Sequence, residues 1–136
     1  VNLGIGWGGL VGLTAMGIYS GLNPMGSGLS FPPFFLAQIF GMAFAGIIGG
    51  LVRPLIIEKK INVLLLVGLA FMGFTITLIY DLLTLLSYPI SAGLGFSGIL
   101  AALFKGLGFT LLHEISNAVV FTVTVPPILR YIKYKN

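Results

Sequence analysis

The sequence predicts an all-α integral membrane protein, folded as one compact bundle of about five hydrophobic helices over residues 1–136. The first reason is composition: 57% of the residues are hydrophobic and only 7% are charged, whereas a soluble domain carries roughly a quarter charged residues. The second is that small residues recur at every fourth position, which places them on one helix face. The third is that apolar and polar residues do not alternate over any long stretch, as they would in a half-buried strand.

Small residues form three such stripes, and each stripe would let another helix approach closely. In lipid, close packing of this kind must supply much of the association between helices, because there is little hydrophobic drive between them. The stripes are Gly4, Gly8 and Gly12; Ala37, Gly41, Ala45 and Gly49; and Gly98, Ala102, Gly106 and Thr110. We interpret the second stripe as a face that packs against a helix of a partner subunit.

The first three apolar segments are each long enough to cross the hydrocarbon, which takes roughly 20 residues. Residues 3–22 form the first segment, which ends at the turn sequence Asn23-Pro24. The second begins after Pro32-Pro33 and runs to about residue 52, and Arg53-Pro54 is expected to stop the helix there. Residues 61–80 form the third segment.

The remaining apolar residues predict two further segments. Residues 92–112 form the fourth, which is interrupted by Lys105 and by Gly106-Leu107-Gly108. A charge at mid-bilayer costs about 3 kcal/mol on insertion scales, so we expect this segment to be broken or only shallowly inserted. Residues 115–132 form the fifth segment, with Pro126-Pro127 inside it.

The basic residues are interpreted as topology signals, and they predict no nucleic-acid site. The net charge is +4, and most of the basic residues lie in two clusters at the ends of apolar segments, as the positive-inside rule expects of cytoplasmic loops. The clusters are Arg53, Lys59 and Lys60, and Arg130, Lys133 and Lys135. Two cytoplasmic clusters require an even number of crossings between them, yet three predicted segments lie there. A shallow fourth segment would remove this conflict.

Polar residues are expected to converge on the extracytoplasmic side. In this topology the loop after the first segment, the end of the third segment at Asp81 and the start of the fifth near His113 all lie there. Ionisable groups beside membrane segments are usually functional or paired, because an unpaired charge in apolar surroundings is costly. Asp81 is therefore an interfacial cap, a partner of Lys105, or a polar contact in an extracytoplasmic pocket.

The sequence around His113 does not predict a metal site. His113-Glu114-Ile115-Ser116-Asn117 begins like the HExxH zinc motif but has Asn117 where the second histidine belongs. A zinc site on one helix face needs both histidines, and the chain has no cysteine that could substitute. We therefore expect no metal, no cofactor and no enzymatic activity.

Four stretches carry a family resemblance. They contain GGLVG leading to GLNP, AQIFGM followed by GIIGG, LIYDLLT, and GFTLLH with SNAV and PPIL, within residues 8–24, 37–50, 78–84 and 108–129. Together they resemble the substrate-binding S components of energy-coupling factor (ECF) vitamin transporters. A ligand of that kind needs an apolar pocket with a few placed polar groups. The residues that could supply those groups are Asn23, Gln38, Tyr80, Asp81, Thr84, His113 and Asn117.

The resemblance implies a multi-pass protein of the plasma membrane that binds a vitamin or related small molecule near its outer face. It implies a transmembrane coupling subunit and two ABC-type ATPases as partners, together with membrane lipid. Family members usually have six membrane helices and an alanine-rich docking motif in the first of them. With about five segments and a start at Val1, we expect this chain to lack an N-terminal helix.

Two other classes of function are compatible with the same residues. An accessory or structural subunit of another membrane complex would use the small-residue stripes only for assembly, and would tolerate Asp81→Ala together with Asn117→Ala. An intramembrane enzyme or ion pathway would use Asp81, His113 and Glu114. That class predicts activity in the isolated chain, with a pH dependence governed by His113.

Overall fold

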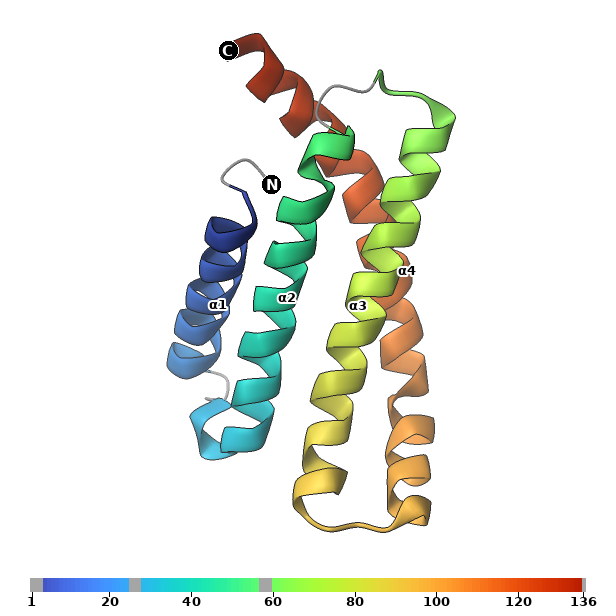
Figure 1. Ribbon diagram of the computed structural model, residues 1–136. Helices are drawn as coiled ribbons and strands as arrows, with labels where there is room; N and C mark the ends of the chain where they lie inside the picture. The colour runs from blue at the N-terminus through green and yellow to red at the C-terminus, as the bar shows by residue number, and fades with distance from the viewer. Residues whose placement is uncertain (1–3, 25–27, 57–59, 136) are drawn as a thin grey trace.

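The computed structural model describes residues 4–24, 28–56 and 60–135, and over these residues the protein consists of four long helices (Figure 1). They are α1 (Ile5–Leu22), α2 (Pro32–Ile56), α3 (Val63–Ser91) and α4 (Phe96–Lys135), and a short 3-10 turn at Gly28–Ser30 precedes α2. All four are long and apolar enough to cross a membrane. The helical fold and its membrane character are as predicted, but the described residues form four helices where about five were expected.

The fourth and fifth predicted segments are a single helix. α4 runs through Lys105, Gly106 and Gly108 without a break, so the expected interruption is wrong. Lys105 lies on an exposed side of the helix, where its long side chain can reach toward the interface while the backbone hydrogen bonds continue. Pro126 and Pro127 also lie inside α4. Membrane helices tolerate proline where neighbouring helices, side chains or waters satisfy the backbone groups that it frees.

α2 and α3 both extend beyond their predicted ends. α2 passes Pro54 and ends at Ile56, so Arg53-Pro54 does not stop it. α3 continues for ten residues beyond Asp81 and ends at Ser91. Asp81 therefore lies inside a helix and not at its end, where the prediction placed it.

A glycine ends α3. Gly93 adopts a left-handed φ of 64°, and its N–H donates to the carbonyl of Ile90. The N–H of Leu94 donates to the carbonyl of Pro89 at 2.9 Å. These two bonds form a Schellman motif, in which glycine adopts the left-handed conformation at little cost. The turn over residues 92–95 then leads directly into α4.

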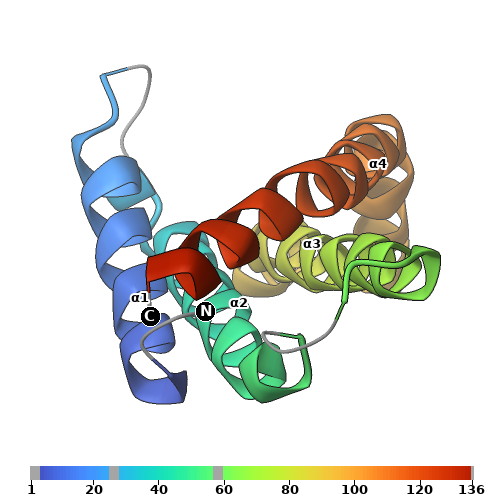
Figure 2. The same ribbon diagram turned by 90° about the horizontal axis from the view of Figure 1, so that it is seen from above.

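The helices follow one another in space in chain order (Figures 1 and 2). α1 packs on α2, α2 on α3, and α3 on α4, while the described residues show no close backbone contact of α1 with α3 or α4, or of α2 with α4. The arrangement is thus two helical hairpins joined along α2 and α3, more open than the predicted compact bundle. Among the described residues, the buried hydrophobic core is Leu65, Leu69 and Ile76 of α3.

Glycines permit the close approach of α1 and α2. A Cβ at Gly12 would collide with the carbonyl oxygen of Met42, and one at Gly46 would collide with that of Gly8. Only residues without a side chain allow two backbones to lie this close. The first predicted stripe thus packs within the chain, and it meets Met42 and Gly46 of α2.

Both basic clusters lie at the same end of the molecule. α3 and α4 are the two crossings between Lys60 and Arg130, and Arg53 lies near the same end in α2; Lys59 is outside the described residues. Two crossings are an even number, so both basic clusters can lie on the same side of the membrane without a shallowly inserted segment. The opposite end contains the end of α1, the start of α2 and the turn between α3 and α4. The sequence carries no charged residue at positions 23–31 or 92–95. By the positive-inside rule we expect the basic end, uppermost in Figure 1, to face the cytoplasm.

Candidate functional site

A cavity of about 470 Å³ lies between α2, α3 and α4. α3 forms its floor, because α2 and α4 both pack on α3 and not on each other. This volume lies within the range of about 300–1,000 Å³ typical of small-molecule sites. The lining residues are Phe34 and Gln38 of α2; Tyr80, Asp81, Thr84, Leu85, Ser87 and Tyr88 of α3; and Gly106, Phe109, Thr110 and His113 of α4. We call this space the polar cavity.

Most of the residues chosen for the pocket from the sequence line the polar cavity. These are Gln38, Tyr80, Asp81, Thr84 and His113. They come from three helices, so the fold brings together residues that are far apart in the chain.

Asn23 and Asn117, also chosen from the sequence, do not line this cavity. Asn23 is the C-cap residue of α1. Asn117 lies one turn beyond His113, and its Nδ2 donates to the carbonyl of His113 at 3.0 Å. Its amide therefore serves its own helix.

The second predicted stripe also has a role inside the chain. A Cβ at Gly41 would lie 2.7 Å from Cδ2 of Tyr80, so Gly41 makes room for a ring of α3. Ala37 lines a cavity between α2 and α3. Packing of this stripe against a partner subunit remains a prediction.

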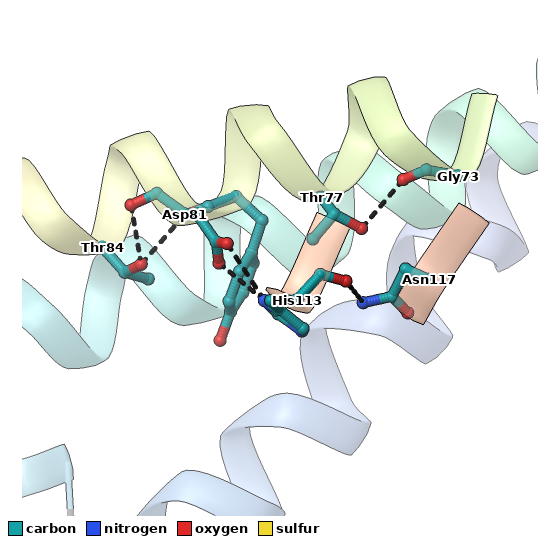
Figure 3. Close-up of polar contacts among 7 residues, drawn as sticks. Gly73, Thr77, Asp81, Thr84, His113 and Asn117 are labelled. Carbon is teal, nitrogen blue, oxygen red and sulfur yellow. Dashed lines mark hydrogen bonds and ion pairs between the residues drawn. The ribbon is translucent and has the colours of Figure 1, made fainter. Parts of the chain in front are cut away.

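Asp81 and His113 form an ion pair between α3 and α4 (Figure 3). Nδ1 of His113 lies 2.8 Å from Oδ1 and 3.1 Å from Oδ2 of Asp81. The Asp81 side chain is 5% exposed and that of His113 is 35% exposed, so the acid is buried and the imidazole is partly accessible. Asp81 thus pairs with His113 and not with Lys105, and it lies inside α3, where it caps no helix end.

This ion pair lies inside the helices and not at their ends. Asp81 is ten residues from the end of α3, which corresponds to about 15 Å at 1.5 Å per residue. The expectation that the third segment closes on Asp81 is therefore wrong. The convergence of the polar groups on the extracytoplasmic side remains a prediction.

Thr84 is already bonded to its own helix. Its hydroxyl donates to the carbonyl of Tyr80 at 3.0 Å and lies 3.1 Å from that of Asp81. A hydroxyl has one proton and two lone pairs, so Thr84 can offer a ligand only an acceptor. Thr77, two turns before Thr84 on α3, donates to the carbonyl of Gly73 at 2.8 Å in the same way (Figure 3).

Gln38 connects α2 to both neighbouring helices. The hydroxyl of Ser20, on α1, donates to Oε1 of Gln38, and the side chain of Gln38 lies close enough to Tyr80 of α3 to interact with its hydroxyl. Gly28 makes room for this contact, since a Cβ there would collide with the Ser20 hydroxyl. Sequence reasoning missed Ser20. The sequence shows only a serine in an apolar segment, and the burial of its hydroxyl becomes evident in the structure.

Aromatic rings flank the imidazole. The ring centroid of His113 lies 5.6 Å from that of Phe109 and 6.3 Å from that of Tyr80. Tyr88 and Phe34 complete the aromatic part of the lining. Except for Tyr80, sequence reasoning did not select these aromatic residues, because rings are frequent in all the apolar segments and give no distinct signal.

Glu114 is a second buried carboxyl group beside the cavity. The residue is 2% exposed, and its Oε1 has no hydrogen-bond partner among the described residues. Its carboxyl group interacts electrostatically with Asp81 and His113, although it does not line the polar cavity. The described residues contain no group of three or more side chains placed to hold a metal ion.

Two other cavities of about 460 Å³ each lie along α2 and α3. Their linings are mostly aliphatic and contain no acidic, basic or imidazole group. A ligand site combines an apolar wall with a few placed polar groups, and the polar cavity best fits that description. Comparison with known proteins finds no matching family model, no matching curated protein and no matching solved structure.

Proposed function

We propose that the chain is the substrate-binding membrane subunit of an ECF-type uptake transporter in the plasma membrane, and that the polar cavity holds a vitamin or related small molecule. One observation carries this proposal: Gln38, Tyr80, Asp81, Thr84 and His113, chosen as ligand-binding residues from the sequence, line one cavity of suitable volume. The family resemblance of the same stretches supports it.

The position of the cavity also agrees with uptake. Its lining residues belong to the halves of α2, α3 and α4 nearer the end without charged connections. The positive-inside rule assigns that end to the outside, from which an uptake substrate must arrive. The energy for release into the cell would come from the proposed partners, a transmembrane coupling subunit and two ABC-type ATPases.

Co-purification tests this function. The chain carries a small C-terminal tag, is expressed in its native membrane and is extracted in mild detergent, and the proteins bound to it are identified by mass spectrometry. A tagged, unrelated multi-pass protein from the same membrane is the control. Specific recovery of a coupling subunit with two ABC-type ATPases supports the proposal. Specific recovery of a different membrane complex, or of the chain alone, contradicts it.

A further inference from the structure

The polar cavity offers a ligand no positive group beyond the imidazole that already pairs with Asp81. Its lining contains the carboxylate of Asp81 and the imidazole of His113, and it contains no lysine or arginine. Nδ1 of His113 already contacts both oxygens of Asp81. An anionic ligand would therefore lie beside a buried carboxylate with no further positive group to offset the repulsion and the loss of hydration.

Glu114 is a second carboxyl group near the Asp81–His113 pair. It is buried, and its Oε1 has no hydrogen-bond partner among the described residues. Burial without a partner favours the neutral form of a carboxyl group, and a positive charge bound beside the pair would favour its ionised form. A cation in the cavity therefore gains from both carboxyl groups, whereas an anion gains from neither.

The walls of the cavity suit a flat ring. Phe34, Tyr80, Tyr88 and Phe109 line the cavity, and the rings of Tyr80 and Phe109 have their centroids 6.3 Å and 5.6 Å from that of His113. The faces of aromatic rings attract cations, most strongly where water is excluded. The aromatic rings favour a flat ligand, and the carboxylate of Asp81 favours a positively charged one.

We propose that the polar cavity binds a small organic cation built on a flat nitrogen ring. The positive charge lies beside Asp81, with Glu114 behind it, and the ring lies among the aromatic side chains. This inference rests on the proposed function, since it names the substrate class of the same cavity. Neutral and anionic rings of the same size bind more weakly, because neither brings a positive charge to the carboxyl groups of Asp81 and Glu114.

Three probes of nearly equal size separate charge from shape: ring-N-methylated nicotinamide, which is a cation; nicotinamide, which is neutral; and nicotinate, which is an anion. Thermal unfolding of the purified, natural full-length protein in detergent is measured with each probe at rising millimolar concentration. The cation should stabilise most and bind about tenfold more tightly than nicotinamide, a factor that corresponds to about 1.4 kcal/mol. Nicotinate should bind most weakly.

The result that overturns the inference is equal stabilisation by all three probes, stronger stabilisation by nicotinate, or no stabilisation by any. None of these results affects the recovery of a coupling subunit with its ATPases. The two proposals can therefore fail separately.

Two sets of variants locate the effect. Asp81→Asn keeps an acceptor for His113 and removes the charge, so it should abolish the preference for the cation over nicotinamide. Phe109→Leu should weaken binding of the cation several-fold. Phe104→Leu is its matched control, since Phe104 and Phe109 are both on α4 and both 70% exposed, but only Phe109 lines the cavity.

These variants also provide a second way to refute the inference. An unchanged cation preference in Asp81→Asn contradicts it. If that variant fails to fold, the comparison on α4 still decides, because equal binding by Phe109→Leu and Phe104→Leu would exclude the aromatic wall from the site.

Discussion

Gly73 lies where α3 and α4 approach closely, and one added methyl group there should separate them. A Cβ at Gly73 would lie 2.9 Å from the carbonyl oxygen of Asn117 and 2.9 Å from Cγ of Phe121. The first contact is with backbone, which cannot move without shifting α4. At Gly68, five residues earlier on the same helix, a Cβ would meet nothing within 4 Å. Gly68→Ala is therefore a matched control for Gly73→Ala.

The size of the effect follows from two terms. Replacing glycine by alanine inside a helix favours the helix by about 1 kcal/mol at both positions, so this term cancels in the comparison. Overpacking a well-packed contact costs typically about 1–3 kcal/mol, and it applies only at Gly73. We expect Gly73→Ala to be less stable than Gly68→Ala by about 1–3 kcal/mol.

The assay is unfolding of the two purified variants in mixed micelles with rising sodium dodecyl sulfate, followed by circular dichroism. Gly73→Ala should unfold at a lower fraction of the denaturing detergent. Its ligand affinity should also fall, because a shift of α4 moves His113 relative to Asp81. Equal stability of the two variants would refute the close approach of α3 and α4 at this position.

Three further predictions concern orientation, the Gln38 link and the start of α3. The chain contains no cysteine, so single-cysteine labelling of intact cells with an impermeant thiol reagent should modify Ser97→Cys and spare Lys60→Cys; the reverse pattern would invert the orientation. Ser20→Ala leaves Oε1 of Gln38 without its donor and should lower the free energy of unfolding by about 1–3 kcal/mol, whereas an unchanged value would mean that the hydrogen bond contributes nothing. Asn62 accepts from the N–H of Leu65 at 2.9 Å at the start of α3, so Asn62→Ala should lower that free energy by about 1 kcal/mol; no loss in the same unfolding assay would argue against this N-cap.

The class of fold could be predicted from composition, but the number of helices could not. Lys105 and Gly106 suggested a break because a charge and a flexible residue each oppose insertion or helix formation. In the structure α4 continues through both, since Lys105 occupies an exposed side and Gly106 makes room for Leu85 of α3. Whether a helix continues depends on such neighbours, which a single segment of sequence does not reveal.

The polar members of the site could be predicted because polar residues are rare in this chain. Gln38, Asp81 and His113 interrupt apolar segments, and each would be costly in lipid without a partner. The position of Asp81 along α3 could not be predicted, because it depends on where α3 ends. Sequence reasoning did not find Phe34, Tyr88, Phe109 and Ser20, since phenylalanine, tyrosine and serine occur throughout membrane helices. Only the packing of α1 on α2, and of α2 and α4 on α3, selects particular ones.

The most direct test of a ligand-binding cavity is to identify what the protein carries. The chain is purified from its native membrane alongside Tyr80→Leu, which alters the cavity, and Phe104→Leu, which does not. Small molecules released by denaturing each sample are compared by mass spectrometry. The account expects one compound to be retained by the unaltered chain and by Phe104→Leu, and to be lost from Tyr80→Leu. The same compounds in equal amounts from all three proteins would contradict it.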